Sequence, residues 1–154
     1  MSEAVKKLAP VPVEQILAQA RFFSGLTQAQ IERVAALARI ERFPQDTRIY
    51  MLADAADDFY VLADGMVRFT LGLGKRETSA GEIIRRGDVF GWAALIAGAQ
   101  KRIATAFCLT SCEVIALDGS ALIALMDGDH SLGYALMQQL SVLLSSELTS
   151  FAAG

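Results

Sequence analysis

The chain has 154 residues, of which 53% are hydrophobic, and a formal net charge of -3 at pH 7. This length supplies one hydrophobic core without disulfide or metal cross-links, so we expect one domain. The slight acidic excess argues against direct nucleic-acid binding, which needs a face rich in lysine and arginine. The sequence lacks the uninterrupted apolar block of a signal peptide or membrane span, so we expect a cytoplasmic protein with no membrane partner.

Pro10 and Pro12 mark a short N-terminal lead. Thr27 and Gln30 have the spacing of a capping box, and apolar residues follow at the helical period. A helix is therefore expected to begin near Thr27.

After this helix the pattern changes to short apolar, β-branched and aromatic runs separated by turn residues. Many short strands at such spacing predict an antiparallel sandwich or barrel. Asp64 and Gly65 lie between residues 59–62 and 66–69 of two neighbouring runs and tolerate positive φ, which predicts a β-hairpin. The runs are RIERF, TRIYML, DFYVLADG, MVRFTLG, ETSAGEIIRRGD, ATAFCLT and CEVIALDG.

The helical period returns near the C-terminus. A short helix is expected over Ser120–Met126, broken at Asp127-Gly128, and Asp129 is expected to cap a longer helix that ends near Phe151. The apolar positions of the longer helix cover roughly half of its circumference, more than an ordinary one-sided helix needs. We predict a homodimer through residues 129–151; one wide contact with the core is the alternative. The apolar positions are Leu132, Leu136, Met137, Leu140, Leu143, Leu144 and Leu148.

The two cysteines are Cys108 and Cys112. On the expectation that both lie on one strand, their Cα atoms are roughly 13 Å apart, too far for a disulfide. A structural zinc site needs four ligands. The chain has only one histidine to add to the two cysteines, so the cysteines make a poor zinc site. We predict two small core residues, no metal site and no cofactor.

The stretch Gly91-Trp92-Ala93-Ala94 combines a glycine with one expected turn of helix. Glycine permits a backbone conformation that other residues resist, and the first N–H groups of a helical turn attract anions. A phosphate held there would also need a cation, and Arg102 can supply a bidentate contact. The alternative is that Arg102 forms a solvated surface pair with Lys101.

Three motifs follow one another along the strand region: Asp58-Phe59-Tyr60-Val61-Leu62 ending in Gly65, Gly87-Asp88-Val89-Phe90-Gly91, and Arg102-Ile103-Ala104-Thr105. With the expected N-terminal helices, this order resembles the cyclic-nucleotide-binding domain of the catabolite-activator (Crp/Fnr-like) family of bacterial regulators. The resemblance covers about Phe22 to Ser150. It implies an α+β, mainly β fold: a double-stranded jelly-roll β-barrel with N-terminal helices and a long C-terminal dimerisation helix. The expected division is 1–20 for the N-terminal lead and helix, 21–128 for the jelly roll and 129–154 for the C-terminal helix.

The resemblance also implies the ligand-binding residues. Arg102 is the counterpart of the arginine that binds the cyclic phosphate. Trp92 stands where the family has a glutamate for the ribose 2′-hydroxyl, a loss worth roughly tenfold or more in affinity, and Ile103 replaces a hydroxyl residue. On the last helix, Glu147 and Leu148 lie where the family contacts the purine, but leucine makes no polar contact. The expected ligand-binding set is Gly91, Trp92, Ala93, Ala94, Arg102 and Ile103, with Glu147 and Leu148 on the purine side.

Two main functions stay open. One is a non-enzymatic sensory module that binds a cyclic nucleotide or other small anionic, nucleotide-like effector, with Trp92 as a stacking face, and signals through its C-terminal helix to an unknown downstream protein. The other is an interaction or dimerisation module without a ligand, in which Trp92 fills the pocket. Transcription factors of the family continue into a helix-turn-helix, so the sensory half of a longer regulator is a further possibility, although the ending at Gly154 leans towards a short complete protein. An enzyme is not expected, since His130 is the only histidine and no catalytic cluster can be assembled.

Overall fold

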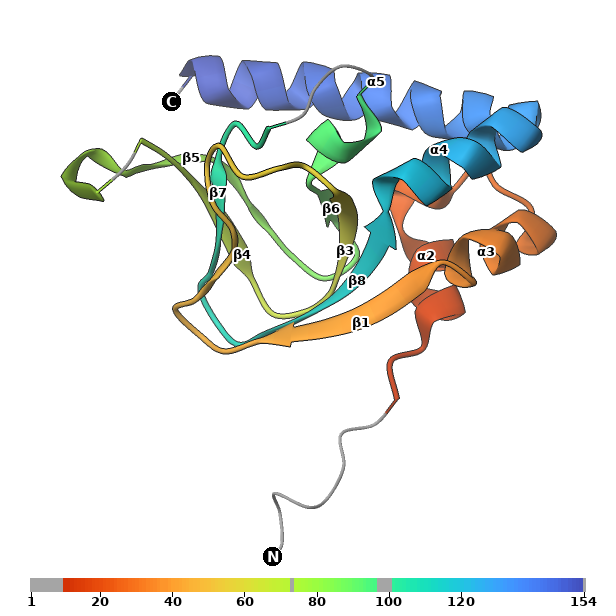
Figure 1. Cartoon of the computed structure of the whole chain (residues 1–154), viewed down its shortest axis with the longest axis horizontal. Helices are drawn as coiled ribbons and strands as arrows, with labels where there is room; N and C mark the ends of the chain where they lie inside the picture. Colours follow the sequence, from red (N-terminus) through yellow and green to blue (C-terminus); the bar gives the residue numbers. More distant parts are fainter. Residues whose placement is uncertain (1–9, 73, 97–100, 154) are drawn as a thin grey trace, which may run out of the picture.

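The computed structural model of the chain describes residues 10–72, 74–96 and 101–153. In these residues, eight strands form two antiparallel sheets of four, in the orders β1-β8-β3-β6 and β2-β7-β4-β5 (Figure 1). This is the predicted jelly roll, although the two sheets stay separate and do not close into one barrel. The strands are β1 Ala38–Phe43, β2 Arg48–Tyr50, β3 Asp58–Asp64, β4 Val67–Leu71, β5 Thr78–Ile84, β6 Val89–Phe90, β7 Thr105–Cys108 and β8 Cys112–Asp118.

Each of the seven predicted strand runs matches one of these strands, with β1 beginning one residue before its run, and only β6 was not predicted. The prediction of a hairpin at Asp64 and Gly65 is wrong. Gly65 does adopt a positive φ of 101°, but β3 pairs with β8 and β6, whereas β4 pairs with β5 and β7. The turn carries the chain from one sheet to the other, so its two flanking strands share no hydrogen-bonded ladder.

The two central strands of the first sheet, β8 and β3, are buried on both faces, which explains why they are almost continuously apolar. Phe59 and Val61 of β3 pack on one side with the helices, and Tyr60 and Leu62 pack on the other side against the second sheet. Strand β8 alternates in the same way. Successive side chains of a strand point to opposite faces of the sheet, so β3 and β8 contribute to two separate hydrophobic cores.

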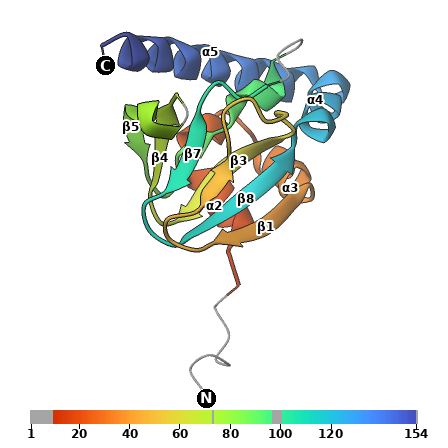
Figure 2. The same ribbon diagram turned by 60° about the vertical axis from the view of Figure 1, so that its left-hand side comes forward.

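The helices cover the outer face of the first sheet, and α5 lies along one end of both sheets (Figure 1, Figure 2). The predicted capping box is confirmed, since Thr27 and Gln30 exchange both of its hydrogen bonds at the start of α3. The helices are α2 Val13–Gln19, α3 Gln28–Ala35, α4 Gly119–Gly128 and α5 His130–Ala153, with short 3-10 turns η1 Arg21–Phe23, η2 Gly74–Arg76 and η3 Trp92–Leu95.

The two C-terminal helices agree with the expected pair, with one correction at their junction. Helix α4 continues through Asp127 and Gly128, so the break comes at Asp129. Asp129 caps α5 as predicted, because its Oδ1 accepts the amide of Leu132 at 3.2 Å.

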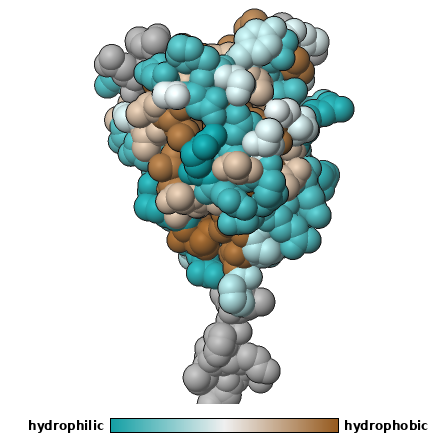
Figure 3. All heavy atoms as spheres, turned by 90° about the vertical axis from the view of Figure 1, so that its right-hand side faces the viewer, coloured by the Kyte–Doolittle hydropathy of each residue, from teal (hydrophilic) through white to brown (hydrophobic). Residues whose placement is uncertain are grey.

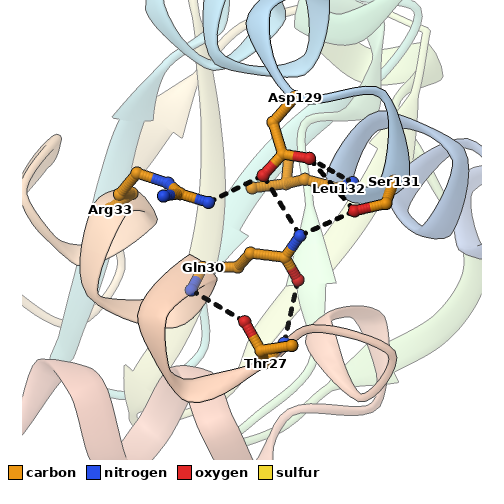
Figure 4. A network of polar contacts seen from close by, with 6 residues as sticks. All are labelled: Thr27, Gln30, Arg33, Asp129, Ser131 and Leu132. Carbon is orange, nitrogen blue, oxygen red and sulfur yellow. Dashed lines mark hydrogen bonds and ion pairs between the residues drawn. The ribbon is translucent and has the colours of Figure 1, made fainter.

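Asp129 also ties this junction to α3 (Figure 4). Its carboxylate accepts hydrogen bonds from Arg33 Nη2 at 2.7 Å, Gln30 Nε2 at 3.1 Å and Ser131 Oγ at 3.0 Å. The buried amide of Gln30 also donates to Ser131 Oγ at 3.0 Å. We call Gln30, Arg33, Asp129, Ser131 and Leu132 the α3–α5 clasp. The hydrogen bond from Gln30 is the largest cause that holds the pKa of Asp129 below its usual range.

The two cysteines do not share a strand, which corrects the expectation. Cys108 ends β7 in the second sheet and Cys112 begins β8 in the first. Both are buried and free, so they are the core residues that the sequence suggested. Burial, and then the neighbouring Cys112, raise the pKa of Cys108 to about 12. A thiol in this environment is a weak nucleophile.

The face that carries α2, α3 and α4 is mostly hydrophilic, with separate hydrophobic areas (Figure 3). Among the described residues, no helix is both long enough and apolar enough to span a bilayer.

Candidate functional site

Gly91 begins the site, between β6 and η3, and needs to be glycine. Its φ is +80°, and a Cβ atom there would lie 3.0 Å from Tyr60 Cδ2, 3.1 Å from Arg102 Nη1 and 3.1 Å from the carbonyl oxygen of Asp58. The positive φ that the sequence suggested is therefore present, and so is a close approach of three neighbouring groups.

Arg102 is buried, with 4% of its surface exposed. The alternative of a solvated surface pair is therefore wrong, although Lys101 itself is exposed. Arg102 Nη1 donates to the carbonyl oxygen of Gly91 at 2.9 Å, and Nη2 donates to that of Asp58 at 2.6 Å. Its Nε is buried and has no hydrogen-bond partner among the described residues. Two carbonyl groups thus hold the guanidinium while most of its five N–H donors stay available.

Aromatic side chains surround this cation. The guanidinium carbon of Arg102 lies 4.1 Å from the ring centroid of Tyr50 and 5.8 Å from that of Tyr60. Tyr60 in turn stacks on Phe90 at 5.0 Å. Burial raises the pKa of Tyr60 to about 12 and raises that of Tyr50 further, so both phenols stay neutral around the charged guanidinium.

The space left beside Arg102 is a cavity of only about 20 Å³. It is lined by six of the eight expected residues: Gly91, Trp92, Ala93, Arg102, Ile103 and Glu147. Ala94 does not line it; its carbonyl oxygen would lie 2.6 Å from a Cβ on Gly119, so Ala94 packs η3 against the start of α4. Leu148 does not line it either, since its side chain is 71% exposed.

Sequence reasoning missed Tyr50, Phe69 and Ala104, which also line this cavity. Of these three residues, Tyr50 lies over the guanidinium of Arg102. Nothing in the run TRIYML singles out its tyrosine, because Tyr50 meets Arg102 only through the fold, where β2 pairs with β7.

Trp92 and Glu147 meet where α5 crosses this cavity. Trp92 is half-buried and packs against the helix-side core. Burial raises the pKa of Glu147, the charge of Glu82 raises it further, and a hydrogen bond with the Trp92 side chain opposes both effects. The cavity therefore has a cation from the β7 side and a carboxylate from α5, with an indole beside them.

Within the described residues, no group of three or more histidine, cysteine, aspartate or glutamate side chains is placed to hold a metal ion. What the geometry offers is a buried cation, held in place by carbonyl groups and bordered by aromatic rings.

A sequence model of one family, described as "Cyclic nucleotide-binding domain", matches residues 40–129, more than half of the chain. The chain belongs to the cyclic nucleotide-binding domain family. The match includes the whole stretch from Gly91 to Ile103 that holds the expected ligand-binding residues, which we call the cassette. It ends at Asp129, the residue that caps α5.

Known proteins with similar sequence or structure agree with this membership. The domain is 34% identical over 82 residues to a cGMP-dependent protein kinase of Toxoplasma gondii, a match that covers 53% of this chain and only 8% of the kinase. Its fold is similar to that of a candidate cyclic nucleotide-binding protein from Geobacter metallireducens GS-15, with a TM-score of 0.76, 22% identity and coverage of 90% of this chain and 99% of the other.

The fold is also shared with larger regulators. The catabolite activator protein of Thermus thermophilus gives a TM-score of 0.69 at 24% identity, covering 80% of this chain and 58% of the other. The regulatory domain of Toxoplasma gondii PKA, solved with cAMP, gives 0.71 at 24% identity, covering 84% and 48%. The expected resemblance to the catabolite-activator fold is confirmed.

Proposed function

We propose that this cyclic nucleotide-binding domain is a non-enzymatic regulatory module that binds a small anionic, nucleotide-like effector at Arg102 and signals through α5. One observation carries the proposal: Arg102 is buried and forms no ion pair within the described residues. A buried charge without an ion-pair partner is costly. Glu147 lines the same cavity but forms none of the ion pairs of the described residues with Arg102. An anionic ligand would supply the ion-pair partner, and family membership makes a cyclic nucleotide the first candidate.

Effector binding requires the site to open. A cavity of about 20 Å³ holds no nucleotide, and Tyr50, Trp92 and Glu147 occupy the space around the guanidinium. A ligand shifts such an equilibrium only as far as it binds the open arrangement better. Because the apparent affinity falls with the fraction of open molecules, we expect weaker binding than a preformed pocket would give. Trp92 in place of a glutamate weakens it further, so the cassette is a degenerate one.

Two routes connect this site with α5. Glu147 belongs to α5 and lines the cavity itself. In addition, Ala94 of η3 packs on Gly119 at the start of α4, which leads to the clasp at Asp129. An effector that displaces Glu147 or η3 would therefore change the position of α5.

The outer face of α5 supports a homodimer as the form that signals. Tyr134, Met137, Ser141, Leu144 and Leu148 follow one another at alternating intervals of three and four residues, the spacing of a coiled-coil seam. Tyr134 is 67% exposed and Leu148 71%, whereas Leu132, Leu136 and Leu140 are buried in the core. Hence α5 carries a mainly apolar seam beside its core face, interrupted by Ser141 and joined to the core at Leu144. A second copy of the chain would cover this seam.

The small cavity favours a second candidate function, an interaction module that has lost its effector. In that case Trp92 fills the pocket permanently, and the domain acts through its dimer seam. The two functions differ in one measurable property, the binding of cyclic nucleotide.

Thermal unfolding with excess cAMP or cGMP tests the first function. At one hundred times the dissociation constant we expect about 2.7 kcal/mol of stabilisation, or roughly 5–10 °C in Tm. The single tryptophan of the chain lies in the site, so its fluorescence should change with the same midpoint. Arg102→Gln should abolish both signals, because it removes the cation and keeps a donor for the carbonyl groups.

Arg48→Gln is the matched control, because Arg48 is exposed and pairs with Glu77 outside the site. It should leave the nucleotide shift unchanged. No shift with either nucleotide would refute a cyclic-nucleotide effector, and new binding by Trp92→Glu would then support the module that lost its effector.

A further inference from the structure

A second and larger cavity lies next to the site, in a groove of about 300 Å³ between β5 and α5. Ile83 and Ile84 of β5 line one side, Val142 and Leu143 of α5 line the other, and Phe22 of η1 also lines it. Ile83 is 38% exposed and Val142 56%. The groove therefore leaves aliphatic surface open to solvent along both of its edges, and the apolar side chains of a partner would cover this surface.

The charged residues of the groove are unbalanced. Glu82, Asp88 and Glu147 contribute three carboxylates, and Arg21 is the one basic residue that lines it. None of these four side chains forms an ion pair within the described part of the chain. The charge of Glu82 also raises the pKa of Glu147, so these carboxylates, from β5 and α5, repel each other. A cation between them would relieve this repulsion.

Long basic side chains suit such a surface. Arginine and lysine lay their aliphatic stems on apolar surface and keep their charged heads among carboxylates. A groove of about 300 Å³ is at the lower end of the range for small-ligand pockets, about 300–1,000 Å³. It accommodates a few side chains and no folded domain.

We infer that the groove between β5 and α5 docks a short segment of a partner protein that carries basic and aliphatic side chains. The charge complementarity comes from Glu82, Asp88 and Glu147, and the apolar contact comes from Ile83 and Val142. Gln139 and Val142, on the groove side of α5, lie on a different face from the seam residues Met137 and Leu148. Docking therefore leaves the dimer seam free. It also needs no effector at Arg102, so it goes beyond the proposed function.

Fluorescence anisotropy of a short labelled peptide of alternating arginine and leucine tests this inference in the absence of cyclic nucleotide. We expect saturable binding that weakens at high salt, as screened charges require. A peptide with glutamate in place of arginine should not bind. Glu82→Lys should weaken binding about tenfold, and Val142→Ser should weaken it severalfold by removing aliphatic surface. Both side chains are exposed, so the fold should persist, which circular dichroism checks.

Glu14→Lys is the matched control. Glu14 is exposed on α2, away from the groove, and the substitution changes the net charge by the same amount. It should keep the affinity within twofold. If the Glu82 and Glu14 variants lose the same affinity for the peptide, the binding is only the general attraction of a basic peptide to an acidic protein. That result would overturn the inference. Equal affinity for the glutamate peptide would overturn it too.

Discussion

Arg102 and Gly91 illustrate how single residues build this site. The arginine is buried because two carbonyl groups accept its Nη donors and the Tyr50 ring covers it. One of those carbonyls belongs to Gly91, whose missing side chain leaves room for the guanidinium. The position of the cation therefore depends on a glycine eleven residues before it.

Gly91→Ala should both destabilise the domain and displace the guanidinium. The new methyl group would meet three groups at 3.0–3.1 Å in a backbone conformation with φ of +80°. We expect a loss of about 2–4 kcal/mol in the free energy of unfolding, from backbone strain and overpacking together. Urea denaturation measures this loss.

Gly74→Ala separates the two contributions. Gly74 also has a positive φ, of +58°, but a Cβ there would meet nothing within 4 Å. It should cost about 1 kcal/mol, from backbone strain alone. Equal losses at both positions would contradict the close packing described around Gly91.

At the scale of elements, the clasp holds the junction between α4 and α5 against α3. Asp129 is the shared acceptor for α3, for Ser131 and for the amide of Leu132. The hydrogen bond from Gln30 is the main cause of its lowered pKa, which makes the clasp dependent on pH.

We expect the clasp to weaken in acid. Since the folded pKa of Asp129 lies below the unfolded value of about 3.9, its stabilisation is complete above that value and is lost as the pH falls through the folded pKa. Asp129→Asn should lower the stability at neutral pH and flatten the decline of stability below about pH 4. Urea denaturation across this range measures both effects.

Asp127→Asn provides the comparison, because Asp127 is exposed at the end of α4. It should follow the wild-type pH profile. If Asp129→Asn keeps the full acid sensitivity, the clasp does not couple α3 to the junction through this carboxylate.

At the scale of the whole molecule, the apolar surface of α5 decides whether the domain acts as one copy or two. Leu148→Glu puts a charge on the seam without touching the core, because this side chain is 71% exposed in one chain. We expect the wild type to sediment as a dimer and this variant to sediment as a monomer with unchanged secondary structure. Charged residues at seam positions oppose pairing.

Ser146→Glu adds the same charge on the groove side of α5. It should remain a dimer. If the wild type is monomeric at every concentration, the proposal of a dimer through the seam is wrong. That result would favour a domain that signals as a single chain.

The sequence by itself determined the local structure of this protein. The helix caps at Thr27 and Asp129 follow from short-range hydrogen bonds. The strand runs and the long final helix follow from the periods of strand and helix. The three ordered motifs, which extend from Asp58 to Thr105, indicated the jelly roll through their resemblance to a known family. The capping and periodicity signals lie within a few residues of one another, so they can be seen without the fold.

Only the tertiary structure decided how the elements meet. It separated β3 from β4, placed Cys108 and Cys112 in different sheets, and buried Arg102 under Tyr50. Arg102 and its acceptor Asp58 are 44 positions apart, and the choice of strand partners depends on which faces both sheets bury together. Whether a charge is paired, solvated or enclosed is a property of such distant neighbours, because burial is the sum of everything that packs around a group.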